Sequence, residues 1–322
     1  MELLKKTRKA AVLFFILGAT LFLATVIVFV MDYALVEMRL RVPVVYENKI
    51  RHDAYNAFYA AMAELKEYTT IDGSLYSPKQ GWGSLLADGR ARLPEGLTCK
   101  VEIVDETGKL PLPVLKESEL EDLLYEIGFT ESDASVVSQL LLDWVDSDDS
   151  ARLQGAEKDD YDVDAAVPPN RMLRSFDELR YVKDISNYFF SEGGQPNEIY
   201  EKFVSAVSIL NTTGEVNFNT ASELVLRALY KMDDIDFDNN IFDAISGDAA
   251  GVRDGITWVT QKTELENRGA TLPLRYVGVS ARILSIYVSV SRGVSKFTLT
   301  AVCSVSGNSI TVNSLIEGGR RK

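Results

Sequence analysis

The sequence is short of the residues on which most catalytic and nucleic-acid-binding sites are built. It has one histidine, His52, around which any Ser-His, Cys-His or histidine-rich zinc site would have to form. Its two cysteines, Cys99 and Cys303, lie far apart and form no CxxC pattern. Its 34 basic residues are outnumbered by 47 acidic ones, and the net charge of −13 argues against a nucleic-acid-binding surface.

An uncharged apolar run spans residues 10–31, directly after four basic residues. As a helix, a run of this length spans about 30 Å of hydrocarbon. Basic residues precede it and the acidic residues Asp32 and Glu37 follow, which favours a body on the non-cytoplasmic side. A cleaved secretory signal is the competing interpretation, but such signals usually have a shorter apolar core, and no A-x-A-like site follows. The run therefore predicts a membrane anchor.

The helical pattern continues beyond the anchor. An apolar stripe of helical period recurs in residues 51–68 and consists of Tyr55, Phe58, Tyr59, Met62 and Leu65. This stripe predicts a helix that packs against a globular body. A stalk that merely holds the body is the alternative that periodicity leaves open.

Strand-like alternation marks two distant parts of the chain. It occurs in residues 97–103 and returns only in 275–317, where three antiparallel strands with glycine-containing turns are expected. The intervening part is helical in pattern, with N-cap spacings at Ser118/Glu121, Thr130/Asp133, Ser175/Glu178 and Thr220/Glu223. The sequence thus predicts an α+β fold in which a helical region is inserted into a small antiparallel sheet. Both cysteines fall on the apolar side of expected strands, and a disulfide and two free thiols both remain open.

The segment 141–164 holds nine carboxylates and only two basic residues. Counted from Asp146, oxygen-bearing side chains at positions 1, 3, 5 and 12 have the ligand spacing of a calcium loop. Ala151 replaces the usual glycine, so the loop is not a standard EF-hand. Carboxylates without histidine or thiolate favour calcium over zinc or copper, while a solvated acidic loop is the alternative. The predicted calcium ligands are Asp143, Asp146, Asp148, Asp149, Glu157 and Asp160.

Three segments, "LLDWVDSDDSARLQGAEKDDY", "PPNRMLRSFDELRYV" and "GEVNFNTASELVLRAL", follow a basic leader and an apolar helix. In this order they resemble the minor pseudopilin K family (general secretion pathway protein K) of the bacterial type II secretion system. The resemblance implies a single-pass inner-membrane prepilin with its body in the periplasm and calcium in the acidic loop. It implies no enzymatic activity, but a place at the pseudopilus tip, where the subunit helps to initiate assembly and caps the filament for export of folded proteins across the outer membrane.

The partners that the resemblance implies are the minor pseudopilins I and J, with minor pseudopilin H, the major pseudopilin G and the prepilin peptidase. It places peptidase cleavage between Ala10 and Ala11, and it puts Phe15 where most pilins carry glutamate. It further implies a prepilin leader over 1–10, a transmembrane N-terminal helix over 11–41 and the first part of a pilin-like α+β region over 42–108. A helical insertion made of two SAM-like units, 109–210 and 211–275, is implied over 109–275. C-terminal strands that complete the pilin-like sheet, with a basic tail, are implied over 276–322.

Two other functions compete with this one. The segment 216–229 also resembles the helix-hairpin-helix element of competence receptors, which makes a membrane-anchored DNA-uptake protein the alternative. The acidic stretch that follows it, "YKMDDIDFDNN", would repel phosphate, so no nucleic-acid partner is expected. A hydrolase is disfavoured because the carboxylates cluster without a neighbouring activated nucleophile.

Overall fold

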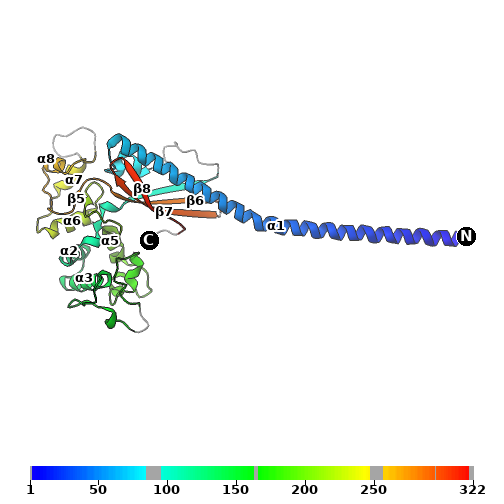
Figure 1. Cartoon of the computed structure of the whole chain (residues 1–322), viewed down its shortest axis with the longest axis horizontal. Helices are drawn as coiled ribbons and strands as arrows, with labels where there is room; N and C mark the ends of the chain where they lie inside the picture. Colours follow the sequence, from blue (N-terminus) through cyan, green and yellow to red (C-terminus); the bar gives the residue numbers. More distant parts are fainter. Residues whose placement is uncertain (1, 85–95, 163–165, 247–256, 294, 319–322) are drawn as a thin grey trace.

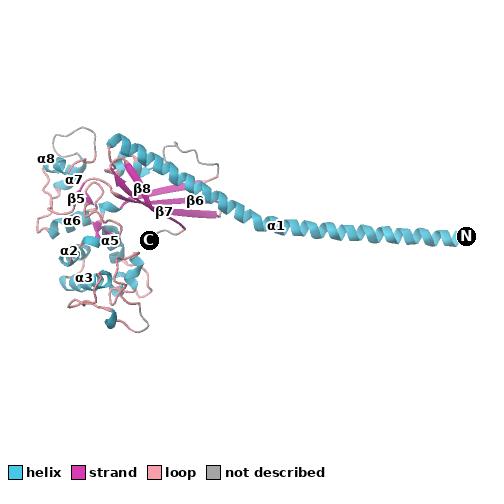
Figure 2. Ribbon diagram, viewed as in Figure 1, coloured by secondary structure: helices cyan, strands magenta, loops and turns pink. Residues whose placement is uncertain are grey.

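The computed structural model describes residues 2–84, 96–162, 166–246, 257–293 and 295–318. A single long helix, α1 (Glu2–Asp72), projects from a body that contains the sheet and all the other helices (Figure 1). The body lies around the C-terminal part of α1. The far end of the molecule, away from the N-terminus, is formed by short helices (Figure 2).

The apolar segment Phe15–Val36 of α1 is exposed. Phe15–Val36 is long and apolar enough to cross a membrane, and none of it is buried inside the protein. Exposed apolar surface of this extent normally meets lipid or another protein. This observation agrees with the N-terminal apolar helix expected from sequence.

The C-terminal part of α1 packs against the sheet. The expected stripe is confirmed at Phe58 and Leu65, which are buried, but Tyr59 is 61 % exposed, so its expected place on the packed face was wrong. The buried face recurs at i, i+3 and i+4, as expected for one side of a helix. Several of its residues are alanines, whose small side chains allow the helix to approach the strands closely. Its members are Ile50, Ala54, Ala57, Phe58, Ala61 and Leu65.

One antiparallel sheet of four strands brings together the two distant strand regions. Its order is β1-β6-β7-β8, so the first strand pairs with one that lies about 180 residues later in the chain. The three C-terminal strands expected from alternation are confirmed. The strands are β1 (Thr98–Asp105), β6 (Ile283–Arg292), β7 (Ser295–Ser306) and β8 (Ser309–Glu317).

The sheet register decides the question of the disulfide. Cys99 lies opposite Val290, and Cys303 lies opposite Leu284, so the two cysteines are about six residues apart along β6. At the rise of a β-strand this is roughly 20 Å, much more than a disulfide spans. Both thiols are free. Burial raises the pKa of Cys303 to about 11 and also raises the pKa of Cys99.

The region between β1 and β6 is mainly helical and has its own hydrophobic core, separate from the core between α1 and the sheet. Its α-helices are α2 (Glu117–Ile127), α3 (Glu131–Val145), α4 (Ser186–Phe189), α5 (Glu198–Ala206), α6 (Glu223–Met232), α7 (Asn240–Ser246) and α8 (Lys262–Asn267). Two short parallel pairs join its ends, β2 (Leu110–Pro111) with β3 (Val207–Ser208), and β4 (Val216–Asn217) with β5 (Val277–Gly278). The 3₁₀ helices of this region are η3 (Glu106–Gly108), η4 (Leu112–Val114), η5 (Lys158–Asp160) and η6 (Phe176–Arg180). Two more precede β1: η1 (Pro78–Gln80) and η2 (Trp82–Ser84).

The expected helix starts are partly confirmed. Thr130 caps α3, and Ser175 caps a 3₁₀ helix, η6. Ser118 is not a cap, because α2 begins earlier, where the Lys116 amide donates to Glu119. Thr220 is not a cap either: Ser222 caps α6.

Thr220 instead belongs to a buried polar cluster where the sheet meets the helical region. We call Asp105, Thr107, Asn217 and Thr220 the junction cluster. Asp105, at the end of β1, accepts hydrogen bonds from the Thr107 amide (2.9 Å) and hydroxyl, from Asn217 Nδ2 (2.7 Å) and from Thr220 Oγ1 (2.6 Å). Burial raises the pKa of Asp105, although these hydrogen bonds act in the opposite direction. The cluster ties β1 to the β4–α6 segment.

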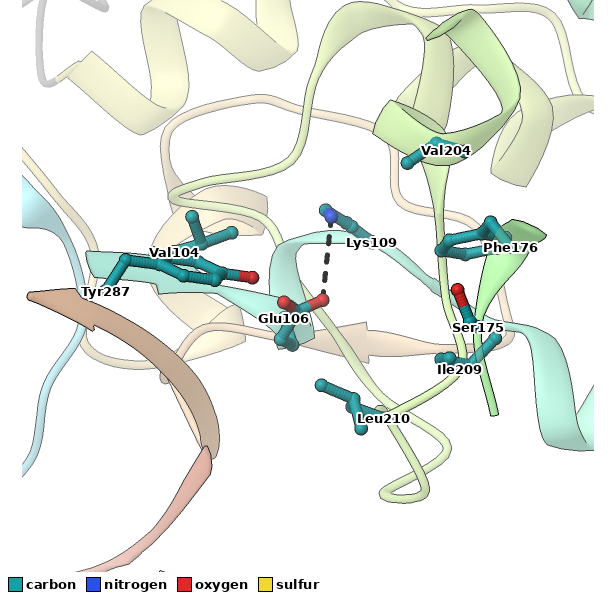
Figure 3. A pocket seen from close by; sticks show the side chains of 9 residues that line it. All are labelled: Val104, Glu106, Lys109, Ser175, Phe176, Val204, Ile209, Leu210 and Tyr287. Atoms are coloured by element: carbon teal, nitrogen blue, oxygen red, sulfur yellow. Dashed lines mark ion pairs between the residues drawn. The ribbon is translucent and has the colours of Figure 1, made fainter. Parts of the chain in front are cut away.

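The neighbouring carboxylate, Glu106, makes the same connection a second time. It accepts from Ser285 Oγ on β6 (2.7 Å) and from Ser208 Oγ on β3 (2.8 Å), and it pairs with Lys109 Nζ (3.5 Å). Figure 3 shows the Glu106–Lys109 pair beside a pocket whose walls come from both parts: Val104 and Tyr287 from the sheet, and Ser175, Phe176, Val204, Ile209 and Leu210 from the helical region.

The junction cluster yields a first prediction. Asn217→Ala removes the amide that donates both to Asp105 and to the Tyr76 carbonyl (2.8 Å). Because both acceptors are then left short of a partner, the free energy of unfolding should fall by about 2–3 kcal/mol. Urea denaturation of the detergent-solubilised chain measures this loss. The control Asn313→Ala, on the exposed strand β8, should change it by no more than about 0.5 kcal/mol. Equal losses in the two variants would contradict the importance of the junction.

Candidate metal centre

The acidic loop begins where α3 ends. The apolar face of α3 is buried, including Trp144, whose ring lies 5.9 Å from that of Tyr161. The helix stops at Asp146, whose amide donates to the Leu142 carbonyl (2.8 Å). The core position of Trp144 therefore determines where the first carboxylates of the loop lie.

Two polar side chains of α3 hold the segment Arg152–Gly155 of the loop. Asp143 is fully buried and accepts from the Arg152 amide (3.0 Å) and guanidinium, while Gln139 Oε1 accepts from the Gln154 amide (2.8 Å). A Cβ on Gly155 would lie 1.7 Å from Asp143 Oδ2, so no larger residue fits there. The loop is thus fastened to the helix at one end.

Arg152 also contacts two further carboxylates. Its guanidinium donates to Asp146 Oδ2 (2.7 Å) and lies 3.4 Å from Glu117 Oε2 on α2. Burial lowers the pKa of Arg152, but its hydrogen bonds and charge interactions with Asp146 and Asp143 outweigh this, and the net pKa is raised. The guanidinium therefore remains charged within the loop.

Glu157 has the opposite environment. It is 5 % exposed, and neither carboxylate oxygen has a hydrogen-bond partner among the residues that the structure describes. One oxygen of Asp146, Oδ1, is likewise buried and unpaired. Oxygen atoms of Asp146, Asp148 and Glu157 lie within 4.8 Å of one another. Burial, followed by repulsion from Asp143 and Asp146, raises the pKa of Glu157.

Three converging carboxylates of this kind require a proton or a cation. A calcium ion binds oxygens at about 2.3–2.6 Å, so two ligands on opposite sides of it lie roughly 5 Å apart. The observed oxygen separations therefore suit a hard divalent cation. The absence of histidine and thiolate from this donor set disfavours zinc.

The other predicted ligands lie nearby but have different partners. Asp143 faces Arg152, Asp149 Oδ1 accepts from Asn170 Nδ2 (3.1 Å), and Asp160 Oδ2 accepts from the Glu157 amide (3.0 Å). Sequence reasoning did not identify the roles of Arg152 and Asn170. The only signal for Arg152 was its position as one of two basic residues among nine acidic ones.

The acidic loop lies within a segment that matches a known protein family. Residues 106–192, which include α2, α3 and the acidic loop, match the model described as "Type II secretion system (T2SS), protein K". The match begins at Glu106 of the sheet–insertion junction and ends before α5.

Two curated proteins resemble the chain over part of its length. The type II secretion system protein K of Pseudomonas aeruginosa PAO1 is 29 % identical over 154 residues, which cover 44 % of this chain and 43 % of that protein. A candidate type II secretion system protein K of Escherichia coli K12 is 32 % identical over 130 residues, covering 38 % of this chain and 34 % of that protein. The chain thus spans less than half the length of the curated relatives it matches.

A solved structure resembles the fold over most of the chain. It is a chain from the crystal structure of the GspK-GspI-GspJ complex of enterotoxigenic Escherichia coli, with a TM-score of 0.60 and 16 % identity, covering 88 % of this chain and 100 % of that chain. The likeness concerns the fold: in this chain a long apolar helix runs into a four-stranded antiparallel sheet that is interrupted by helices. In sequence, the chain is similar to the type II secretion system protein K family over residues 106–192, and to two curated proteins of that name over less than half of their length.

The unpaired Glu157 carboxylate yields a second prediction. Because burial raises its pKa in the folded state, the metal-free fold loses stability as pH rises above the ordinary value of 4.5 and through the folded-state pKa. In EDTA at neutral pH, Glu157→Gln should therefore raise the free energy of unfolding by about 1–2 kcal/mol. The gain should disappear at pH values well below 4.5, where Glu157 is protonated in both states.

Thermal unfolding of both proteins across this pH range, in EDTA, tests the prediction. Glu201→Gln, which alters an exposed carboxylate on α5, is the matched control and should leave the profile unchanged. A constant difference between wild type and Glu157→Gln at every pH would show that the charge of Glu157 is not the cause.

Proposed function

We propose that the protein is a minor pseudopilin at the tip of a type II secretion pseudopilus. In this role it helps to initiate assembly and caps the filament for export of folded proteins across the outer membrane. The observation that carries the proposal is the placement of two features at opposite ends of one molecule. The exposed apolar helix Phe15–Val36 lies at one end, and the helical insertion lies at the other (Figure 1).

This placement supports a capping role on physical grounds. An apolar helix without a partner in its own chain is suited to pack against the helices of subunits below it or to lie in the membrane. The helices between β1 and β6 add bulk at the distal end of the body, where a further subunit would have to be added. The role is structural and requires no enzymatic activity.

We also propose a single-pass inner-membrane precursor with its body in the periplasm. Prepilin peptidase would cut between Ala10 and Ala11, both of which lie within α1. The fifth mature residue would then be Phe15 rather than glutamate. A subunit at the tip has no neighbour above it whose N-terminal charge needs a carboxylate, so the apolar residue suits this position.

The proposed division of the body keeps the bounds set out from sequence. Residues 42–108 and 276–322 form a pilin-like unit, and 109–275 form two SAM-like units, 109–210 and 211–275. Support comes from the pairing of β1 with β6 and from the separate hydrophobic cores of the two parts. The pairing of β4 with β5 extends the insertion's contacts slightly past residue 275.

We propose calcium as the ion of the acidic loop. Asp146, Asp148 and Glu157 would supply the converging oxygens, and Asp143, Asp149 and Asp160 would support the cage from around it. The unpaired oxygens of Glu157 support binding over a merely solvated loop, since a solvated carboxylate would not be buried. When bound, calcium would supply the positive charge that joins the loop's two ends.

The calcium proposal predicts that excess calcium raises the melting temperature of the chain. At a hundredfold excess over the dissociation constant, the stabilisation is about 2.7 kcal/mol. Glu157→Gln and Asp148→Asn should abolish the shift, whereas Glu201→Gln should retain it. Absence of both a calcium-dependent shift and heat in a titration of the wild-type chain would refute the proposal.

The assembly proposal names the minor pseudopilins I and J as direct partners, with minor pseudopilin H and the major pseudopilin G below them. Co-expression of the full chain with pseudopilins I and J of the same genome should give a stoichiometric complex in detergent. A chain that ignores these proteins and binds DNA at physiological salt would favour the DNA-uptake alternative. That alternative has little support here, because four carboxylates outnumber the two cations around the end of α6; they are Asp122, Glu126, Asp234 and Asp236, against Arg227 and Lys231.

A further inference from the structure

The acidic loop already contains a cation of its own. The Arg152 guanidinium contacts three carboxylates from different parts of the chain: Asp143 on α3, Asp146 at the end of α3, and Glu117 on α2. Arg152 is only partly exposed, and Asp143 is fully buried. The ion pair is therefore an internal element of the loop rather than a surface contact.

Arg152 divides the carboxylates of the loop into two groups. The first, which we call the clamped half, comprises Asp143 and Oδ2 of Asp146, both held by the guanidinium. The second, the open half, comprises Oδ1 of Asp146, Asp148 and the unpaired Glu157. Asp146 belongs to both, with one oxygen turned to Arg152 and the other left without a partner.

We propose that Arg152 is a built-in counter-ion for the buried carboxylates of the loop. It keeps the clamped half folded without metal and restricts the loop to one divalent ion, in the open half. This inference rests on the calcium site proposed above. In this proposal, Arg152 determines how many divalent ions the loop binds and how far the folding of the loop depends on them.

The physical reason lies in the burial of Asp143. Without the guanidinium, its carboxylate would keep only the bond from the backbone amide of residue 152, beside the backbone of Gly155. An uncompensated buried charge is strongly unfavourable, so the clamped half would open or acquire another cation. Calcium is then able to provide what Arg152 provides in the wild-type chain. Removal of the arginine should therefore create a dependence on metal that the wild type lacks.

Hydrogen exchange of the loop and native mass spectrometry test the proposal in the full chain in detergent. In EDTA, the wild-type amides of Arg152, Gln154 and Gly155 should be protected, because they bond to Asp143, Gln139 and the Arg152 carbonyl. In Arg152→Gln their exchange should accelerate at least about tenfold, and excess CaCl₂ should restore protection. The number of bound calcium ions should rise from one in the wild type to two in the variant.

Two further variants make the result decisive. Arg171→Gln removes a comparable partly exposed ion pair, Arg171–Glu178 (3.1 Å), and should leave loop exchange and ion count unchanged. Arg152→Lys keeps the positive charge but loses the planar fork that contacts both Asp143 and Asp146, so its exchange in EDTA should lie between those of the wild type and Arg152→Gln, with one ion bound. If Arg152→Gln does not fold, Arg152→Lys decides: exchange that is faster than in the wild type and restored by CaCl₂ would support the proposal, and wild-type exchange, or faster exchange that CaCl₂ does not restore, would overturn it.

The outcomes separate this inference from the calcium proposal. Two results for Arg152→Gln would overturn the role of Arg152 while leaving the calcium site intact. In one, its loop amides exchange in EDTA as slowly as those of the wild type. In the other, they exchange faster, calcium does not restore their protection, and only one ion binds. A wild-type chain that binds no calcium would refute the calcium site. The exchange in EDTA would then still measure the effect of Arg152 on the clamped half.

Discussion

Two adjacent buried carboxylates, Asp105 and Glu106, hold the sheet and the helical region together. Each part has its own hydrophobic core, so apolar packing within the parts does not by itself orient one on the other. The carboxylates lie at the end of β1 and bind groups from β3, β4 and β6 that are distant in the chain. Buried charges tolerate few alternative arrangements, because each displaced partner leaves an unsatisfied group. The junction therefore specifies one orientation of the insertion relative to α1.

The acidic loop contains a buried carboxylate that lacks hydrogen-bond donors in the described part of the chain. Asp105 is buried with four donors, and Asp143 is buried with a guanidinium and an amide, so both are explained by structure alone. Glu157 is equally buried but has no donor among the described residues. A carboxylate in this state lowers stability unless something outside the chain compensates it. Unpaired burial, rather than the density of acidic residues, is what distinguishes a candidate binding site from a solvated acidic surface.

Much of the fold was predictable because its signals are local. Alternation located the strands, helical period located the packed part of α1, and ligand spacing singled out Asp146, Asp148 and Glu157. Features that depend on contacts distant in the sequence were missed. Thr220 has the spacing of a helix cap, yet its hydroxyl serves Asp105, more than a hundred residues earlier. Likewise, the exclusion of a Cys99–Cys303 disulfide depended on strand register, and the role of Arg152 depended on which carboxylates the fold brings around it. Such contacts leave no periodic pattern in the sequence.

The polar contacts also form a continuous mechanical connection along the molecule. Arg51 and Tyr55 on α1 donate hydrogen bonds to Glu317 of β8 (2.8 and 2.7 Å), which connects the sheet to the long helix α1. The junction then fastens the sheet to the insertion, and Arg275 joins Glu119 on α2 to Asp233 after α6 within the insertion. Each connection is a directional, charge-assisted contact between elements far apart in sequence. The proposed capping role depends on this rigidity, because a freely rotating insertion would leave the next position in the filament accessible.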